Sequence, residues 1–459
     1  MKNIFSVIVV ATVILFAGCK KWEGEQHNIY NYVSPPAHPI SDAAPLCGSI
    51  KGTMLSGKTY TLGCDVTINK GDTLIVEPGV TVYATNQAGI EVEGTFLSLG
   101  TKAAPNFFTV KGITKTDQPG APAISDPAYS GQWKGIIGGT NCALMVIKWT
   151  HIDFAGAAYG PTFGPNVSQK AATSFAVLFQ NYQGVFIMED SWLYGATDDA
   201  MRISDGKIDI MRNTFEKAGP NGGDCVNVKG GTVGTMAYNF YIGTATNGQK
   251  ASNKGQPVGA PQTNIVMYNN TFVNGGYRQI QPGRGANINY EEGARGMFYN
   301  NVNINCKFGN RVLSNPTADI ANMSYGNNYQ YADSLSVANQ FYPQGYITIP
   351  QSTDLPAPTY LPAGYKLGDV YDGSSVVQKL NPMFINYPLP VVGHKLSDIN
   401  AIGNFDFHLQ LNSPLVGRGT TSVQPLVVVP VDPKYGATEI TPPGVDLGCF
   451  QINGKGNQH

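Results

Sequence analysis

The chain has 459 residues and a formal net charge of −1, and only 13% of its residues are charged. A protein that grips nucleic acid through its phosphates needs an excess of Lys and Arg, so no nucleic-acid partner is expected. The 54 Gly and 30 Pro residues favour many turns and short strands over long helices. The length allows several compact domains or one elongated repeat domain.

The N-terminus has the pattern of an export signal. Lys2 precedes an apolar run over residues 4–16, which is shorter than the roughly 20 apolar residues of a membrane-spanning helix. The run ends in Ala17-Gly18-Cys19, which resembles the lipobox of bacterial lipoproteins of the Bacteroidetes type. This resemblance implies a signal peptide over residues 1–18, lipidation of Cys19, and membrane contact through the lipid anchor alone.

Residues 19–45 are predicted to form a flexible, lipidated tether. They are rich in Pro, Ala, Ser and Asn without apolar periodicity, which favours extended, solvated backbone. Acidic residues after the lipidated cysteine resemble an outer-leaflet signal of the Bacteroides group, and Glu23 and Glu25 fit it, although two lysines directly follow Cys19. We therefore expect an outer-membrane lipoprotein at the cell surface, with periplasmic retention as the alternative.

Six cysteines remain in the mature chain, and an exported protein folds where disulfides persist. Cys47 and Cys64 are predicted to pair across a short loop at the start of the folded body. The other four lie in apolar runs far apart, and buried thiols are the favoured interpretation for them: Cys142, Cys225, Cys306 and Cys449.

Short β-branched runs separated by Gly recur between residues 62 and 110 and predict strands with sharp corners between them. Further along, an Asn recurs between apolar runs roughly every 26 to 31 residues, a spacing typical of a solenoid. We expect these Asn side chains to stack at one turn and to satisfy backbone groups. The predicted stack consists of Asp190, Asn213, Asn239, Asn269, Asn300 and Asn327.

Five segments resemble secreted right-handed β-helix proteins of the pectate-lyase-like superfamily: Gly71–Val80 and Gly131–Ile137 in its opening coils, residues 381–384 and 405–415 in its last coils, and Val445–Phe450 in its close. The predicted fold is all-β, a single-stranded right-handed parallel β-helix with loop insertions and an irregular C-terminal cap. We expect the β-helix over residues 46–332 and Pro-rich loops, terminal coils and cap over residues 333–459. The segment 244–262 is expected to be the longest projecting loop.

In several central coils, a charged residue follows the stacked Asn of that coil by a similar number of positions in the sequence. Asp224 follows Asn213 by eleven positions, and Arg311 follows Asn300 by the same number. Equal offsets in a solenoid predict neighbouring positions on one face. The predicted face contains Asp198, Asp199, Asp224, Arg278 and Arg311, and an adjacent strand is expected to add Asp205, Lys229 and Arg284.

The superfamily resemblance implies a polysaccharide partner. Carboxylates on this face could hold Ca²⁺ beside a uronate while an Arg or Lys acts as base, which defines a Ca²⁺-dependent lyase hypothesis. Its metal ligands are Asp198, Asp199 and Asp224. Its catalytic residues are Arg278, Lys229 and Arg284, and its substrate-binding residues are Arg202, Tyr277, Tyr290 and Arg311.

Other functions stay open beside the lyase. The segment Gly222–Lys229 resembles the Gly-Asp-Asp-Cys motif of polygalacturonase-type glycosidases, but Gly223 replaces its first aspartate, and no His lies between His151 and His394. The charges could also form a surface network on a structural or adhesive protein. A surface protein that binds polysaccharide, beside an outer-membrane transporter or enzyme, is the favoured interpretation.

Overall fold

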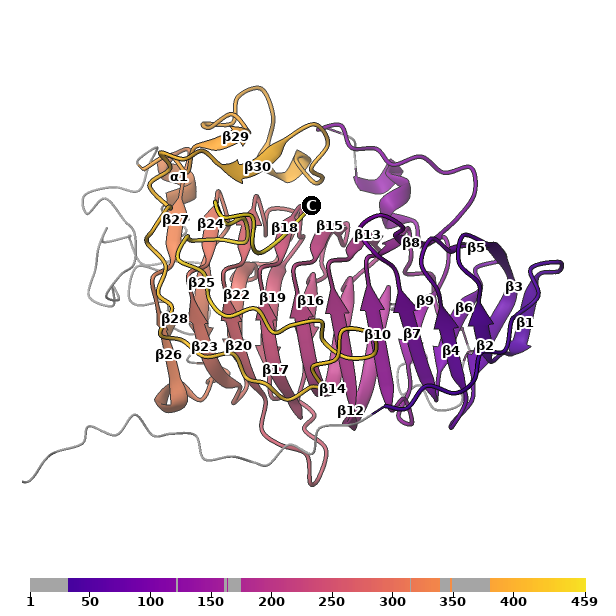
Figure 1. Cartoon of the computed structure of the whole chain (residues 1–459). Helices are drawn as coiled ribbons and strands as arrows, with labels where there is room; N and C mark the ends of the chain where they lie inside the picture. The colour runs from indigo at the N-terminus through magenta and orange to yellow at the C-terminus, as the bar shows by residue number, and fades with distance from the viewer. Residues whose placement is uncertain are drawn as a thin grey trace, which may run out of the picture.

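The computed structural model describes residues 32–120, 123–160, 163, 175–313, 315–338, 347–348 and 380–459. The predicted signal peptide and Cys19 lie outside these residues. The described strands wind into a right-handed parallel β-helix, as the sequence predicted (Figure 1). None of the helices in the described part of the chain is long and apolar enough to cross a membrane.

Three parallel sheets form the sides of the solenoid, and each coil contributes one strand to each sheet. The first sheet contains β6 (Gly89–Val92), β9 (Gly135–Gly138), the starts of β12 (Val177–Glu189) and β14 (Met201–Met211), β16 (Val226–Val228), β19 (Asn247–Ser252), β22 (Ala286–Glu291), β25 (Asn310–Leu313) and β28 (Ile347–Thr348). The second contains β2 (Gly52–Met54), β4 (Thr73–Val76), β7 (Thr95–Leu99), β10 (Leu144–Lys148), the ends of β12 and β14, β17 (Thr232–Ala237), β20 (Asn264–Tyr268), β23 (Arg295–Tyr299) and β26 (Met323–Gly326).

The third sheet contains β5 (Thr81–Ala84), β8 (Asn106–Thr109), β11 (Thr150–Asp153), β13 (Trp192–Ala196), β15 (Thr214–Ala218), β18 (Phe240–Ile242), β21 (Thr271–Val273), β24 (Val302–Ile304) and β27 (Tyr329–Tyr331). β3 (Thr59–Ile68) bends from the third sheet into the first and also pairs with β1 (Leu46–Ser49). The helices are short: α1 (Leu335–Ala338), and the 3-10 turns η1 (Ala123–Ser125), η2 (Pro127–Tyr129), η3 (Ile320–Asn322) and η4 (Leu396–Asp398).

The interior of the solenoid is a stack of apolar side chains, one above the other on successive coils. The rings of Phe215, Tyr241 and Phe272 show this stacking, with centroids 4.9 and 4.8 Å apart. That separation matches the distance between hydrogen-bonded strands, because each ring projects inward from the same position of its coil. Alternate residues of each strand therefore point out of the core, which sets up the polar face described below.

The predicted Asn stack exists, but its register is corrected by one residue along much of its length. The buried side chains that link the coils are Thr150, Ser191, Asn213, Asn239, Asn270, Asn301 and Asn328. Each Asn from Asn239 to Asn328 accepts a backbone N–H of the preceding coil through Oδ1, at 3.0–3.1 Å. The stack is therefore a structural ladder inside the turn between the second and third sheets.

The residue before each ladder position has a positive φ and points outward, which describes Asp190, Asn269, Asn300 and Asn327 of the predicted stack. Asn tolerates this left-handed conformation better than most residues. In a pair such as Asn269-Asn270, the first Asn adopts it and the second joins the ladder. The sequence could not say which member of Asn269-Asn270 points inward.

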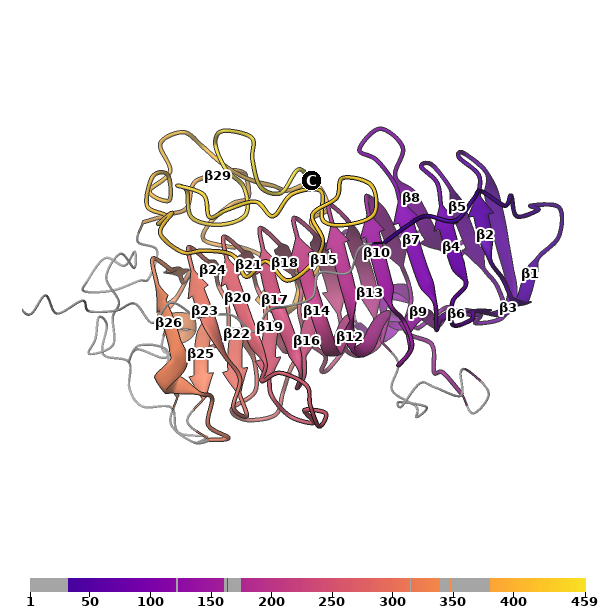
Figure 2. The same ribbon diagram turned by 60° about the horizontal axis from the view of Figure 1, so that its bottom comes forward.

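Residues 415–459, here named the C-terminal strap, run back along the outside of the solenoid toward β10 (Figures 1 and 2). Val428 and Val429 pack there against apolar residues of the second sheet, including Leu97. β29 (Phe384–Asn386) and β30 (Asp406–Leu409) pair antiparallel outside the coils. The two late motifs therefore do not add the terminal coils that we predicted.

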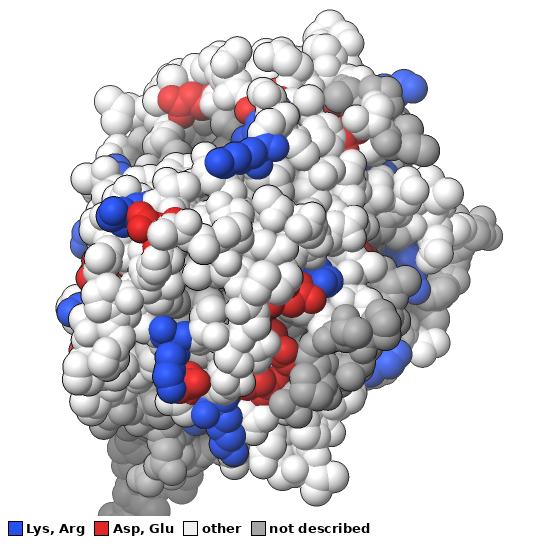
Figure 3. Space-filling view, turned by 90° about the vertical axis from the view of Figure 1, so that its right-hand side faces the viewer, with Lys and Arg blue, Asp and Glu red and all other residues white. Residues whose placement is uncertain are grey.

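The structure also tests the predictions about the cysteines and the N-terminal tether. Cys47 and Cys64 are joined by a disulfide, and the other four described cysteines are buried thiols. The tether does not stay detached as far as residue 45, because the Ile40 and Thr53 amides donate to Thr53 and His38 carbonyls at 2.8 and 2.7 Å. Figure 3 looks onto this end of the solenoid, where charges of both signs are interspersed on a largely uncharged surface.

Candidate functional site

An open groove lies on the outward face of the first sheet. It has a volume of about 540 Å³ and is lined by the coils that contain β14, β16, β19, β22 and β25. One wall comes from the loops before these strands, such as residues 279–285, and the other from the loops after them, such as residues 315–316. Because its walls are built coil by coil, the groove runs along the solenoid axis.

The floor of the groove follows a column of outward-pointing side chains in register, and four members of the column line it: Arg202, Asn227, Lys250 and Arg311. In the strand register, each position of the column lies opposite the next one on the neighbouring strand. The order is Arg202, Asn227, Lys250, Asn289 and Arg311. Cations thus alternate with amides along the column, while their neighbours in sequence face the core. Adjacent members are about 4.8 Å apart, the spacing of paired strands.

The equal offsets in the sequence did bring most of the predicted site residues together. Seven of them line the groove: Asp198, Asp199, Arg202, Asp224, Lys229, Arg284 and Arg311. Their juxtaposition follows from the repeat, since each coil places the same offset at the same point of the solenoid surface. Their chemical roles remain predictions.

Arg278, predicted as a catalytic base, does not line the groove. Its guanidinium donates to the carbonyls of Ala218, Gly219 and Gly243 at 2.6–3.2 Å and to the Asn400 side chain. It also lies over the ring of Tyr129, 5.1 Å from the centroid. Arg278 therefore ties successive turns together, and its catalytic assignment is wrong.

The two tyrosines predicted to contact substrate are also held elsewhere. Tyr290 lies in the core with no exposed surface, and its hydroxyl donates to the Ile265 carbonyl at 2.7 Å. Tyr277 packs against the small apolar cluster of Ala332 and Val337, and its hydroxyl oxygen is buried. Tyr290 precedes the groove residue Glu291 in β22, but strand alternation turns Tyr290 inward.

The three aspartates predicted to bind Ca²⁺ do not converge on a common point. Asp199 accepts hydrogen bonds from Arg202 at 2.7 and 3.0 Å, and Asp224 Oδ1 accepts two from Asn247 at 2.7 and 3.0 Å. Across the described part of the chain, no group of three His, Cys, Asp or Glu side chains is placed to hold a metal ion. The geometry does not fit the predicted calcium site, and no Ca²⁺ role is carried forward.

Burial of the carboxylates changes their acidity. Burial raises the pKa of Asp198 to about 6, with a further contribution from the negative charge of Asp199. Burial raises the pKa of Asp224 to about 6 as well, again with Asp199 adding to the shift and Lys250 opposing it. Both groups are therefore poised to change charge in mildly acidic solution.

The pKa values of two groove lysines, Lys229 and Lys250, are shifted in opposite directions. Burial lowers the pKa of Lys229, and the positive charges of Lys250 and Arg202 lower it further. Burial also disfavours the charged form of Lys250, but Asp224 and Glu291 outweigh it and raise the pKa of Lys250. The ion pair between Lys250 Nζ and Glu291 Oε1 is 2.7 Å long.

The sequence analysis did not predict several of the residues that line the groove. Lys250 and Lys254 fall inside the segment 244–262 that we predicted as a projecting loop, but β19 occupies its first half. A signal was present, because Lys250 follows Asn239 by the same eleven positions as Asp224 follows Asn213. Other groove residues that the prediction missed are Asn227, Asn247, Gln279, Glu291 and Glu292.

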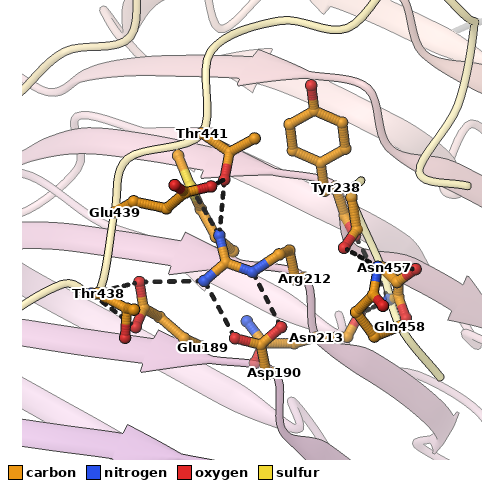
Figure 4. Close-up of polar contacts among 12 residues, drawn as sticks. Glu189, Asp190, Arg212, Asn213, Tyr238, Thr438, Glu439, Thr441, Asn457 and Gln458 are labelled. Atoms are coloured by element: carbon orange, nitrogen blue, oxygen red, sulfur yellow. Dashed lines mark hydrogen bonds and ion pairs between the residues drawn. The ribbon is translucent and has the colours of Figure 1, made fainter. Parts of the chain in front are cut away.

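A second polar cluster lies under the C-terminal strap, on the turn beside the Asn ladder (Figure 4). Arg212 forms ion pairs with Asp190 at 2.9 Å and Glu189 at 3.2 Å, and it donates to the Thr441 hydroxyl at 2.9 Å. The Thr438 amide donates to Glu189 at 3.0 Å. Because the charged side chains are buried and matched by the chain itself, this cluster fastens the strap.

No protein-family model, curated protein or solved structure matches the chain. The resemblance to the pectate-lyase-like superfamily rests on the motifs of the sequence, and the structure shows the β-helix architecture.

Proposed function

We propose that the groove binds a polysaccharide chain. The observation that carries the proposal is the groove floor, where Arg202, Lys250 and Arg311 alternate with amides on successive coils. A trough that extends coil by coil fits an extended polymer, and its amides and cations can bond to hydroxyl and carboxylate groups.

The charged side chains of the groove are positioned by each other, which suits binding. Asp199 holds Arg202 through two hydrogen bonds, and Glu291 holds Lys250. Ligand donors that are already oriented lose less conformational entropy on binding than mobile surface side chains. The fixed floor therefore favours capture of a glycan.

The proposed location follows the N-terminal signal. A lipid on Cys19 would hold the solenoid at the cell envelope, in our proposal at the outer face of the outer membrane. There the groove would collect polysaccharide for a neighbouring transporter or enzyme. Labelling of intact cells with an antibody, before and after permeabilisation, tests the leaflet.

A second candidate function is a metal-independent polysaccharide lyase. It is favoured by Lys229, whose pKa is lowered by burial, so that more of its amine is neutral at neutral pH than for an exposed lysine. The neutral amine would accept the proton from the carbon beside a uronate carboxylate. The electron pair would form a carbon–carbon double bond as the neighbouring glycosidic oxygen leaves.

Affinity electrophoresis of the full chain carrying Cys19→Ala through gels containing uronate-rich and neutral polysaccharides tests the proposal. We expect retardation that is weakened about tenfold by Arg311→Gln and is unchanged by Lys51→Gln, which removes an exposed cation of the first coils. Ultraviolet absorbance of an unsaturated product, abolished by Lys229→Met, would identify the lyase. A chain that is not retarded by any polysaccharide contradicts both functions.

A further inference from the structure

The groove has two ends of opposite character. At the end formed by the coils of β14 and β16, the carboxylates Asp198 and Asp224 line it. At the end formed by the coils of β22 and β25, Arg284 and Arg311 line it. The groove therefore carries a charge gradient along its axis.

The cations at the carboxylate end offset its negative charge only in part. Arg202 forms its ion pair with Asp199 at 2.7 Å, and Lys250 forms its own with Glu291 at 2.7 Å. Three carboxylates, Asp198, Asp199 and Asp224, therefore face two basic side chains of the same coils, Arg202 and Lys229, while Lys250 of the next coil opposes the charge of Asp224. Asp224 is only 5% exposed, so its charge acts where water screens it poorly.

The opposite end of the groove carries two arginines. Arg311 donates to the Gly283 carbonyl at 2.7 Å and lies over the Phe308 ring, 5.2 Å from its centroid. Arg284 extends from the exposed loop that contains Gly283. Glu291 and Glu292, which also line this end, form ion pairs with Lys250 and Lys254 at 2.7 and 3.7 Å.

The distance between the ends suits an oligosaccharide. Paired strands are about 4.8 Å apart, so β16 and β22 are separated by about 10 Å and β14 and β25 by about 19 Å. An extended glycan covers such a distance with a few sugars. Groups of opposite charge on different sugars of one chain could therefore reach both ends.

We propose that the groove selects a glycan that carries amino groups and carboxylates on separate sugars, and that it disfavours a uniformly anionic polyuronate. This inference rests on the proposed polysaccharide-binding function and names its ligand class. Ammonium groups would pair with Asp198 and Asp224, and carboxylates with Arg284 and Arg311. A polyuronate would place carboxylates against Asp198 and Asp224, where like charges repel.

The test uses three polymers with the full chain carrying Cys19→Ala. The first is a copolymer of alternating uronate and N-acetylated amino sugar, the second is the same copolymer after de-N-acetylation, and the third is a polyuronate. Affinities are measured by titration calorimetry at neutral pH and moderate salt. We expect the de-N-acetylated copolymer to bind about tenfold tighter than its acetylated parent, as for one added charge-assisted contact.

Two variants assign the preference to the carboxylate end. Asp198→Asn is expected to reduce the preference for the free amine, and Asp224→Asn to do the same if its thermal unfolding matches that of the parent. Arg284→Gln is the matched control, since it should weaken binding of both copolymers without changing their ratio. Lowering the pH below 6 should also remove the preference, because Asp198 and Asp224 become protonated beside Asp199, Arg202 and Lys250.

The possible failures are distinguishable. Equal binding of the two copolymers, or tighter binding of the polyuronate, overturns the ligand class while leaving polysaccharide binding in place. A preference that persists in Asp198→Asn and in folded Asp224→Asn also overturns it. If none of the three polymers binds, this inference is overturned. If neutral polysaccharides also fail to retard the chain, the proposed polysaccharide-binding function is contradicted as well.

Discussion

Two faces of the solenoid are rich in charged and amide side chains, but only one of them is open. On the first sheet, Arg202, Lys250 and Arg311 line a groove. On the turn beside the Asn ladder, Arg212 and the neighbouring carboxylates are covered by the C-terminal strap (Figure 4). Density of polar residues therefore does not identify a binding site in a β-helix. The deciding feature is whether another segment of the chain covers the polar side chains.

The largest expected effect is on the covered face. Arg212→Met should lower the free energy of unfolding by about 3–5 kcal/mol, because it leaves Glu189 and Asp190 buried without their cation. Denaturant unfolding followed by circular dichroism measures the change. Lys51→Met, at an exposed ion pair, should change stability by less than about 1 kcal/mol. Equal effects of the two variants would mean that the strap is not fastened by this cluster.

An Asn inside the ladder should be more sensitive to substitution than the outward-facing Asn of a neighbouring coil that bonds to the strap. Asn270→Ala removes the acceptor of the Asn239 amide and leaves buried polar groups unsatisfied, so we expect a loss of about 2 kcal/mol. Asn327→Ala, which removes a single hydrogen bond to the Arg418 carbonyl, should cost about 1 kcal/mol or less. The comparison is made by the same unfolding measurement, and a reversed order would contradict the corrected register.

Stability should also depend on pH through Asp209, which is buried near the strap cluster with neither carboxylate oxygen hydrogen-bonded. Burial raises its pKa, and Glu189 and Asp190 add to the shift while Arg212 and Lys148 oppose it. The unfolded chain therefore ionises at lower pH than the folded one, and stability falls as pH rises above about 4.

Asp209→Asn should flatten this part of the pH profile and stabilise the protein at pH 7 by about 1–2 kcal/mol. The measurement is the unfolding free energy of both chains between about pH 4 and pH 8. Parallel profiles would show that Asp209 does not ionise with the pKa shift described.

The sequence predicted the solenoid because its signals are local and repeated. Runs such as Thr73–Val76 between glycines specify strands and corners, and the Asn recurrence specifies the period. The groove followed in part from the same repeat, since Asp224 and Arg311 share an offset. The prediction for Arg278 failed because its turn directs the side chain under the neighbouring loops, where carbonyls of two coils hold it.

The strap could not be predicted, because its contacts join distant parts of the chain. Lys148 donates a hydrogen bond to the Pro433 carbonyl at 3.0 Å across a separation of 285 residues, and no periodicity in the sequence predicts that contact. The motifs near residues 381–384 and 405–415 are local patterns, and they carry no information about whether the segment continues the coils or folds back over them.

The most direct test of the account compares polysaccharide binding by two variants at matched positions of the open and covered faces. Arg311→Gln should weaken retardation by a uronate-containing polysaccharide about tenfold while leaving unfolding nearly unchanged. Thr441→Ala, which removes a strap hydrogen bond to Arg212, should lower stability and leave retardation unchanged. Unchanged retardation by Arg311→Gln, with the polysaccharide still bound, would contradict the claim that the groove on the first sheet is the binding site.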